Sequence, residues 1–211
     1  MMTLQELGRV FATDKGDTKH AFHGRTYLDV YAHYFDEIRH DVRTVLEIGV
    51  WRGESLMMWR EYFPAAEVWG LDIDPELPPN TTLGERVQVV TGSQTDPQAI
   101  WKVAPGRTLD VVIDDGSHLA RHMVASWEAL WGRVSRGGIY CIEDTGCTWR
   151  DLSIEAAEWP GMDRNEDGTD LGEQRGVIEA WMRERMREMD ALVGDVSFVH
   201  VWPMQIVMRK S

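Results

Sequence analysis

Short apolar runs alternate with segments of helical spacing along most of this chain of 211 residues. Each run is followed by a turn and then by a helical pattern, which is typical of alternating strands and helices. The runs are too continuously apolar to have one face in water, so we expect a parallel sheet with helices on both faces. The expected strands are residues 44–50, 67–73, 86–92, 109–115 and 138–144.

The end of the chain has a different pattern. Residues 174–192 have helical spacing, and residues 196–202 and 205–210 are β-rich runs separated by Pro203 and Met204. They predict a helix followed by an antiparallel hairpin. Further helices are expected over residues 54–63, 96–103 and 119–134. The complete order resembles the α/β, Rossmann-like fold of class I methyltransferases: a mostly parallel seven-stranded sheet with helices on both faces and a C-terminal antiparallel hairpin.

Length and charge limit the organisation and the partners. A chain of 211 residues is expected to form a single domain, residues 1–211. A formal net charge of -13 argues against nucleic acid, and no run approaches the roughly 18 apolar residues of a membrane span. We expect a cytoplasmic protein that acts on a small-molecule or oligosaccharide acceptor. Its expected protein partner is a further copy of itself, in a homodimer or a higher homo-oligomer. Two segments outside the strand-helix pattern, residues 1–40 and the acidic flap 159–173, are expected to cover the cofactor and substrate.

The first strand leads into a turn that suits a cationic ligand. Glu47, Gly49 and Gly53 form the pattern E-x-G-x-x-x-G where the strand meets the next helix. The glycines allow close backbone approach, and the carboxylate attracts an ammonium group such as that of S-adenosylmethionine. A dinucleotide site would instead need G-x-G-x-x-G, and Glu47 would repel its pyrophosphate.

The following strand ends carry further candidate contacts with the cofactor. Asp72 can accept hydrogen bonds from ribose hydroxyls, and Ser93 and Gln94 can contact the adenine edge. Asp114 is expected to contact the cofactor or the next turn. The alternative interpretation is an α/β domain with acidic strand ends and no cofactor.

The fourth and fifth strands end in acidic residues. Asp115 is expected to face the Glu143 and Asp144 pair, because neighbouring parallel strands bring their carboxyl ends to one edge. Carboxylates crowded in this way need a cation between them, and oxygen ligands favour Mg²⁺ or Mn²⁺. His118 would lie beside the metal. Two alternatives remain open: an Asp-Asp helix cap, and a histidine that is merely solvated.

At these residues the sequence resembles the metal-dependent sugar O-methyltransferases of the macrocin and mycinamicin type, which are relatives of the cephalosporin hydroxylase-like proteins. The resemblance covers roughly residues 10–150 and includes Thr13-Asp14-Lys15-Gly16 near the start. It implies a metal site made of Asp115, Glu143 and Asp144, with His118 as the catalytic residue.

The resemblance therefore predicts an O-methyltransferase that uses S-adenosylmethionine and Mg²⁺ or Mn²⁺. His118 would remove the proton from a sugar hydroxyl bound at the metal. Tyr27, Tyr31 and Trp149 are candidate contacts for the acceptor. Two other functions remain open: a metal-dependent methyltransferase of catechols or other phenols, and a non-catalytic cofactor-binding module that regulates a partner.

Overall fold

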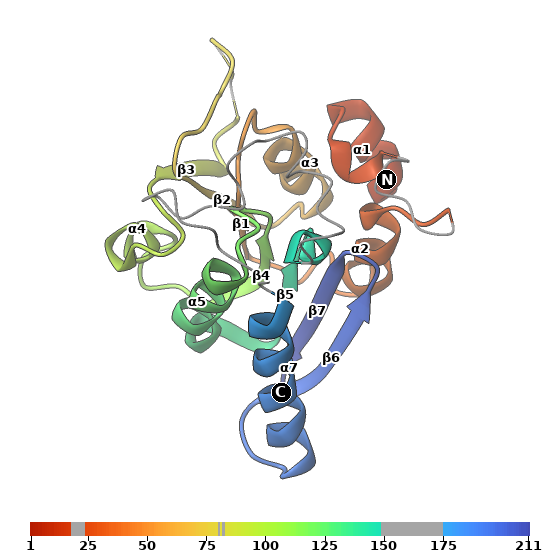
Figure 1. Ribbon diagram of the computed structural model, residues 1–211. Coiled ribbons are helices and arrows are strands. Elements are labelled where there is room, and N and C mark those ends of the chain that lie inside the picture. Colours follow the sequence, from red (N-terminus) through yellow and green to blue (C-terminus); the bar gives the residue numbers. More distant parts are fainter. Residues whose placement is uncertain (18–23, 80, 82, 149–174) are drawn as a thin grey trace.

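The computed structural model describes residues 1–17, 24–79, 81, 83–148 and 175–211. Its centre is one seven-stranded sheet with the strand order β3-β2-β1-β4-β5-β7-β6 (Figure 1). The strands are β1 (Thr44–Ile48), β2 (Glu67–Asp72), β3 (Val87–Thr91), β4 (Leu109–Asp114), β5 (Val134–Ile142), β6 (Val196–Trp202) and β7 (Gln205–Lys210). Strands β1 to β5 are parallel, whereas β7 is antiparallel to both β5 and β6. The predicted Rossmann-like methyltransferase fold with its C-terminal hairpin is confirmed.

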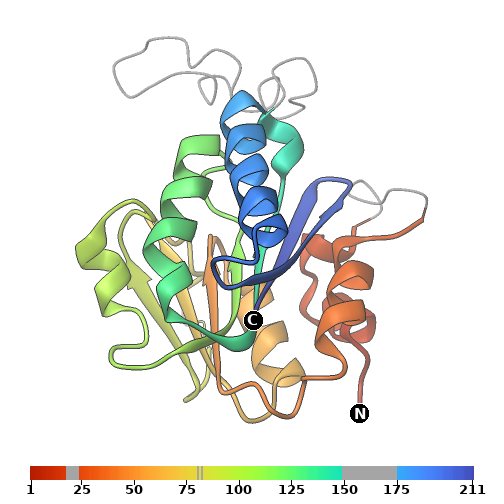
Figure 2. The same cartoon turned by 90° about the horizontal axis from the view of Figure 1, so that it is seen from below.

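The sheet lies between two layers of helices (Figure 2). One layer holds α1 (Leu4–Phe11), α2 (Tyr27–Phe35) and α3 (Glu54–Tyr62), and the other holds α4 (Pro97–Lys102), α5 (Ala120–Leu130) and α7 (Arg175–Asp190). Alternate residues of each strand point to opposite layers, so Val111 and Ile113 join one core and Val112 joins the other. This double cover explains the continuous apolar runs.

The first two helices begin at residues suited to helix caps. Thr3 and Thr26 each form a capping box, with Glu6 and with Asp29 respectively. On the sheet side, α2 packs Tyr31 and Phe35 against Trp59 of α3. The N-terminal segment is therefore part of the core as well as a border of the site described below.

Most expected bounds agree with the structure to within two residues, and two differ by four. The helix expected over residues 119–134 ends at Leu130, and β5 begins at Val134 instead of residue 138. Val134 pairs with Leu109, and the register then shifts so that Val111 pairs with Ile139; the extra residues lie in β5. The buried face of α7 is formed by Ile178 and Trp181, and the ring of Trp181 packs edge-on against that of Trp127.

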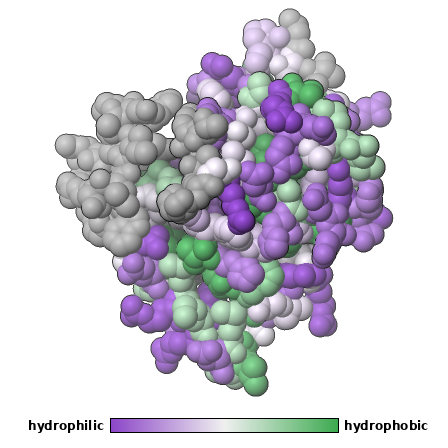
Figure 3. Space-filling view, turned by 90° about the vertical axis from the view of Figure 1, so that its right-hand side faces the viewer, coloured by the Kyte–Doolittle hydropathy of each residue, from purple (hydrophilic) through white to green (hydrophobic). Residues whose placement is uncertain are grey.

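Figure 3 shows one face on which hydrophilic side chains predominate and hydrophobic ones form small separate groups. None of the helices in the described part of the chain is both long and apolar enough to cross a bilayer.

Gly49 provides a test of the β1–α3 turn. It has φ 88°, and a Cβ there would lie 1.9 Å from the backbone oxygen of Asp115. We expect Gly49→Ala to lower the free energy of unfolding by about 1–3 kcal/mol or more, measured by urea denaturation. As a control, Gly176→Ala in α7 has open space around it and should be neutral or stabilising by up to about 1 kcal/mol. Equal stability of the two variants would contradict this account of the turn.

Candidate active site

The backbone ladder brings the ends of three strands to one edge of the sheet. Ile48 of β1 is in register with Asp114 of β4, which is in register with Ile142 of β5. The pattern continues one residue further, because the Asp115 amide donates to the Ile48 carbonyl at 2.9 Å and the Glu143 amide donates to the Asp114 carbonyl at 2.9 Å. The residues that follow β1, β4 and β5 therefore meet at this edge.

A cavity of about 420 Å³ opens at the same edge. Its wall includes Gly49, Asp72 and Asp115 from the strand ends. The turn that begins α3 and the segment from Ala12 to Lys15 form the rest of the wall, together with Gly116. The positive φ of Gly49 lets the backbone of this turn border the cavity directly. Gly53, also at positive φ, is the N-cap residue of α3.

The two acidic residues of the predicted cofactor site have different surroundings. Asp72 Oδ2 accepts from the Val50 amide at 2.6 Å and from the Trp51 amide at 2.9 Å, so it fixes the turn. Glu47 is fully buried; its Oε2 accepts from Ser55 Oγ at 2.6 Å, and its Oε1 has no hydrogen bond among the described residues. A carboxylate has about four acceptor positions, so both retain capacity for a ligand.

Gln94 and Asp114 belong to a buried network beside the cavity. The Gln94 amide donates to Asp114 Oδ1 at 3.1 Å and to Ser126 Oγ at 2.7 Å, and it accepts from the Ser117 amide at 2.8 Å. Burial raises the pKa of Asp114 to about 7. Neither Gln94 nor Asp114 lines the cavity. The hydroxyl of Ser93 forms a hydrogen bond of 2.9 Å with that of Thr95.

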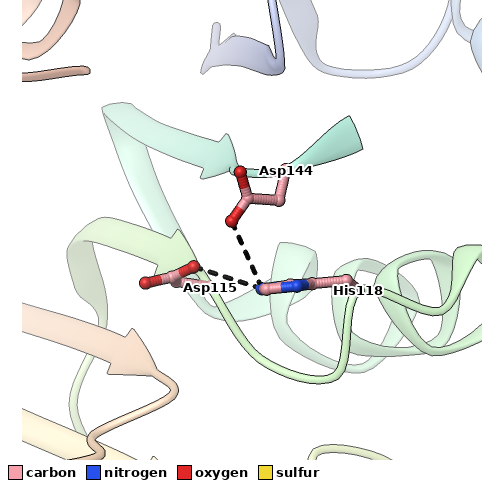
Figure 4. A group of neighbouring side chains, drawn as sticks. All are labelled: Asp115, His118 and Asp144. Atoms are coloured by element: carbon pink, nitrogen blue, oxygen red, sulfur yellow. Dashed lines mark hydrogen bonds and ion pairs between the residues drawn. The ribbon is translucent and has the colours of Figure 1, made fainter. Parts of the chain in front are cut away.

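Asp115, His118 and Asp144 form a compact group that could hold a metal ion (Figure 4). One ligand atom of each lies within 4.8 Å of the others. His118 Nε2 points between the two carboxylates, 3.3 Å from Asp115 Oδ1 and 3.5 Å from Asp144 Oδ2. His118 and Asp144 have φ values of 57° and 51°, a strained conformation that is common at functional sites.

Two tyrosines of α2 hold the other carboxylate atoms. Tyr31 donates from its hydroxyl to Glu143 Oε1 at 2.5 Å, and Tyr27 donates to Asp144 Oδ1. Both rings are buried, at 0% and 3% exposure respectively. Their observed contacts are thus with carboxylates of the site. Trp149 and the flap at residues 159–173 lie outside the described residues.

Lys15 is the site residue to which sequence reasoning gave no role. Its Nζ lies 2.5 Å from Asp115 Oδ2, 2.9 Å from Glu143 Oε1 and 3.4 Å from Glu47 Oε1. A signal for it existed in the charge balance, because the three carboxylates of the predicted metal site, Asp115, Glu143 and Asp144, carry more negative charge than one divalent ion can neutralise. The only feature noted at this position was the short Thr13-Asp14-Lys15-Gly16 segment.

The ammonium of Lys15 influences the ionisation of its neighbours. Burial acts to raise the pKa of Asp115, but Lys15 and His118 hold that pKa below its ordinary value. Burial and the neighbouring Asp115 raise the pKa of Glu143, against the opposing effect of Lys15. Burial lowers the pKa of Lys15, and the surrounding carboxylates more than reverse this, so the pKa lies well above its ordinary value and the side chain is charged.

Comparison with known proteins gives consistent matches. A family model described as a methyltransferase domain matches residues 46–145. Demethylmacrocin O-methyltransferase of Streptomyces fradiae is 32% identical over 88% of this chain and 46% of its own length. Mycinamicin VI 2''-O-methyltransferase of Micromonospora griseorubida is 33% identical over 87% of this chain and 45% of its own length. The chain thus spans about half the length of these curated relatives.

Solved structures match as well. The MycE methyltransferase from the mycinamycin biosynthetic pathway, in complex with Mg and SAH, aligns over 100% of this chain and 55% of its own length, with 28% identity and a TM-score of 0.70. A second MycE structure, with Mg, SAH and mycinamycin VI, aligns with a TM-score of 0.69. The chain is therefore a homologue of the macrocin- and mycinamicin-type sugar O-methyltransferases and has their Rossmann-like methyltransferase fold.

Proposed function

We propose that this chain is an S-adenosylmethionine-dependent, Mg²⁺-assisted O-methyltransferase that acts on a sugar hydroxyl. The acceptor would be a glycosylated natural product, a polysaccharide precursor or an oligosaccharide. The observation that carries the proposal is the position of Asp115, which lines the cavity and also belongs to the group with His118 and Asp144. A methyl donor in the cavity and a metal-bound acceptor would then be adjacent, which is what transfer between them requires.

The cofactor would bind in the cavity at the ends of β1 and β2. Glu47 would accept from its ammonium group, and Asp72 would accept from its ribose hydroxyls. Gly49 has no side chain where its backbone borders the cavity, and Gly53 allows the positive φ with which α3 begins. Ser93 and Gln94 would contact the adenine edge. Asp114 would support the following turn, because it accepts from Gln94 and from the Gly116 amide.

The metal would be held by Asp115, Asp144 and Glu143. Mg²⁺ prefers carboxylate oxygens as protein ligands and usually keeps several water molecules. When bound, the ion supplies positive charge that lowers the pKa of a coordinated hydroxyl. His118 would accept the hydroxyl proton at Nε2, where the nearby oxygens of Asp115 and Asp144 stabilise the resulting imidazolium.

Cofactor binding tests the role of Glu47. We expect S-adenosylmethionine or its demethylated product to bind with about micromolar affinity, measured by calorimetry. Glu47→Gln should weaken binding about tenfold or more, because a charge-assisted hydrogen bond to the ammonium is lost. The matched control is Glu85→Gln, which should bind the cofactor as wild type does, because Glu85 is exposed and does not line the cavity. Glu54 would be unsuitable as a control, because it lines the cavity. Binding of NAD with no binding of either compound would refute the cofactor assignment.

Metal removal tests the carboxylate assignment. Methyl transfer to a glycosylated acceptor should stop with a chelator and return with Mg²⁺ or Mn²⁺. Asp144→Asn should raise the metal concentration for half-maximal activity about tenfold or more, because a charged oxygen ligand is lost. Exposed Asp190 in α7 gives the matched control Asp190→Asn, which should leave this concentration unchanged. Full activity in the presence of a chelator would contradict the role of the metal. Methyl transfer to catechols and not to glycosylated acceptors would show that the protein is instead a methyltransferase of phenols.

A change at His118 separates a base from a ligand. We expect His118→Ala to lower kcat by about 10² to 10⁴ while the affinities for metal and cofactor stay near those of wild type. The residual rate should rise with pH as hydroxide replaces the imidazole. Exposed His40 is the matched control, and His40→Ala should keep the normal rate. Near-normal kcat combined with weakened metal binding would instead make His118 a metal ligand.

A further inference from the structure

Lys15 reaches the centre of the site from the N-terminal segment. It lies in a short 3-10 turn, Asp14–Gly16, that follows α1. Its side chain is only 2% exposed, and its ammonium lies between carboxylates from the ends of β1, β4 and β5. These are Glu47 of the proposed cofactor site and Asp115 and Glu143 of the proposed metal site.

The arrangement matches the bonding capacity of an ammonium group. Lys15 has three N–H donors and no acceptor; it donates a hydrogen bond to Asp115 Oδ2 at 2.5 Å and forms ion pairs with Glu143 Oε1 at 2.9 Å and Glu47 Oε1 at 3.4 Å. Glu47 and Glu143 are almost completely buried, so their charges need a nearby partner. Among the described residues, Lys15 is the cation that the structure pairs with all three of these carboxylates.

Lys15 also divides the oxygen atoms that a metal could use. It takes Asp115 Oδ2, whereas Oδ1 of the same carboxylate faces His118. On Glu143, Lys15 shares Oε1 with the hydroxyl of Tyr31. A divalent ion bound to these carboxylates would thus share two of its ligands with a positive charge already in place.

We propose that Lys15 is an internal counter-cation that keeps the site carboxylates together without metal and weakens divalent-metal binding by competing for Asp115 and Glu143. The inference rests on the proposed metal site. Like charges a few ångströms apart inside a protein repel strongly, so the ammonium must reduce the affinity for a second cation. Through Glu47 the same residue also links the metal side of the site to the cofactor side, which makes Lys15 a positioning residue.

Direct Mn²⁺ binding to cofactor-free protein, followed by electron paramagnetic resonance of the free ion, tests this inference. Lys15→Met preserves the length and apolar packing of the stem but removes the charge, and it should tighten Mn²⁺ binding about tenfold or more. Lys15→Arg retains the charge and should stay within about threefold of wild type. Lys102→Met removes the same charge at an exposed position of α4 and should leave the affinity unchanged.

Thermal unfolding gives a second measurement on the same proteins. Without metal, Lys15→Met should have the lower Tm, because its carboxylates repel one another; added Mn²⁺ should raise the Tm of this variant more than that of wild type. If Lys15→Met does not fold, Lys15→Gln offers an uncharged amide donor in its place, and the same tightening is expected.

Two results would overturn the inference. Unchanged or weaker Mn²⁺ binding in both Lys15→Met and Lys15→Gln would show that Lys15 does not compete with the metal, and would leave the proposed function intact. Absence of Mn²⁺ binding to wild type would overturn both this inference and the metal part of the proposed function. Calorimetry with the demethylated cofactor distinguishes that case from loss of the whole methyltransferase assignment.

Discussion

The hydrogen bonds that join the ends of β1, β4 and β5 are the constraint on which the site depends. They bring the residues after each strand to the same level, so Asp115 and Glu143 become neighbours of the β1 turn. The same alignment places several carboxylates in a small, largely buried volume. Such crowding is unfavourable unless positive charge and hydrogen-bond donors are supplied.

The N-terminal segment supplies what the sheet lacks. Lys15 provides the positive charge, and Tyr27 and Tyr31 donate hydrogen bonds to Asp144 and Glu143. These residues are held in place because α1 and α2 pack into the same core as α3. A segment that precedes the first strand is therefore structural and functional at once: its apolar face stabilises the fold, and its polar residues complete the site.

Three non-glycine residues in a strained backbone conformation lie at the same edge of the sheet. Trp51, His118 and Asp144 all have positive φ, and each follows the end of a strand that borders the site. Non-glycine residues pay an energetic cost in this conformation, which the surrounding hydrogen bonds must offset. At Trp51, the bond from its amide to Asp72 does so, and the Asp144 carboxylate is held by Tyr27. At His118 and Asp144 this conformation accompanies the approach of the two side chains, whose Nε2 and Oδ2 atoms lie 3.5 Å apart.

The sequence by itself determined the alternation of strands and helices in a mostly parallel sheet, the C-terminal hairpin and the acidic residues at the strand ends, because these depend on local patterns of hydrophobicity. It also brought Asp115, His118 and Asp144 to attention, since their positions follow from where strands end. Only the tertiary structure decided that Lys15 lies between Glu47, Asp115 and Glu143, and that Tyr27 and Tyr31 bind carboxylates. The contacts of Lys15 with Asp115, of Tyr27 with Asp144 and of Tyr31 with Glu143 join residues a hundred or more positions apart, and no local pattern encodes which buried charge a distant lysine will meet.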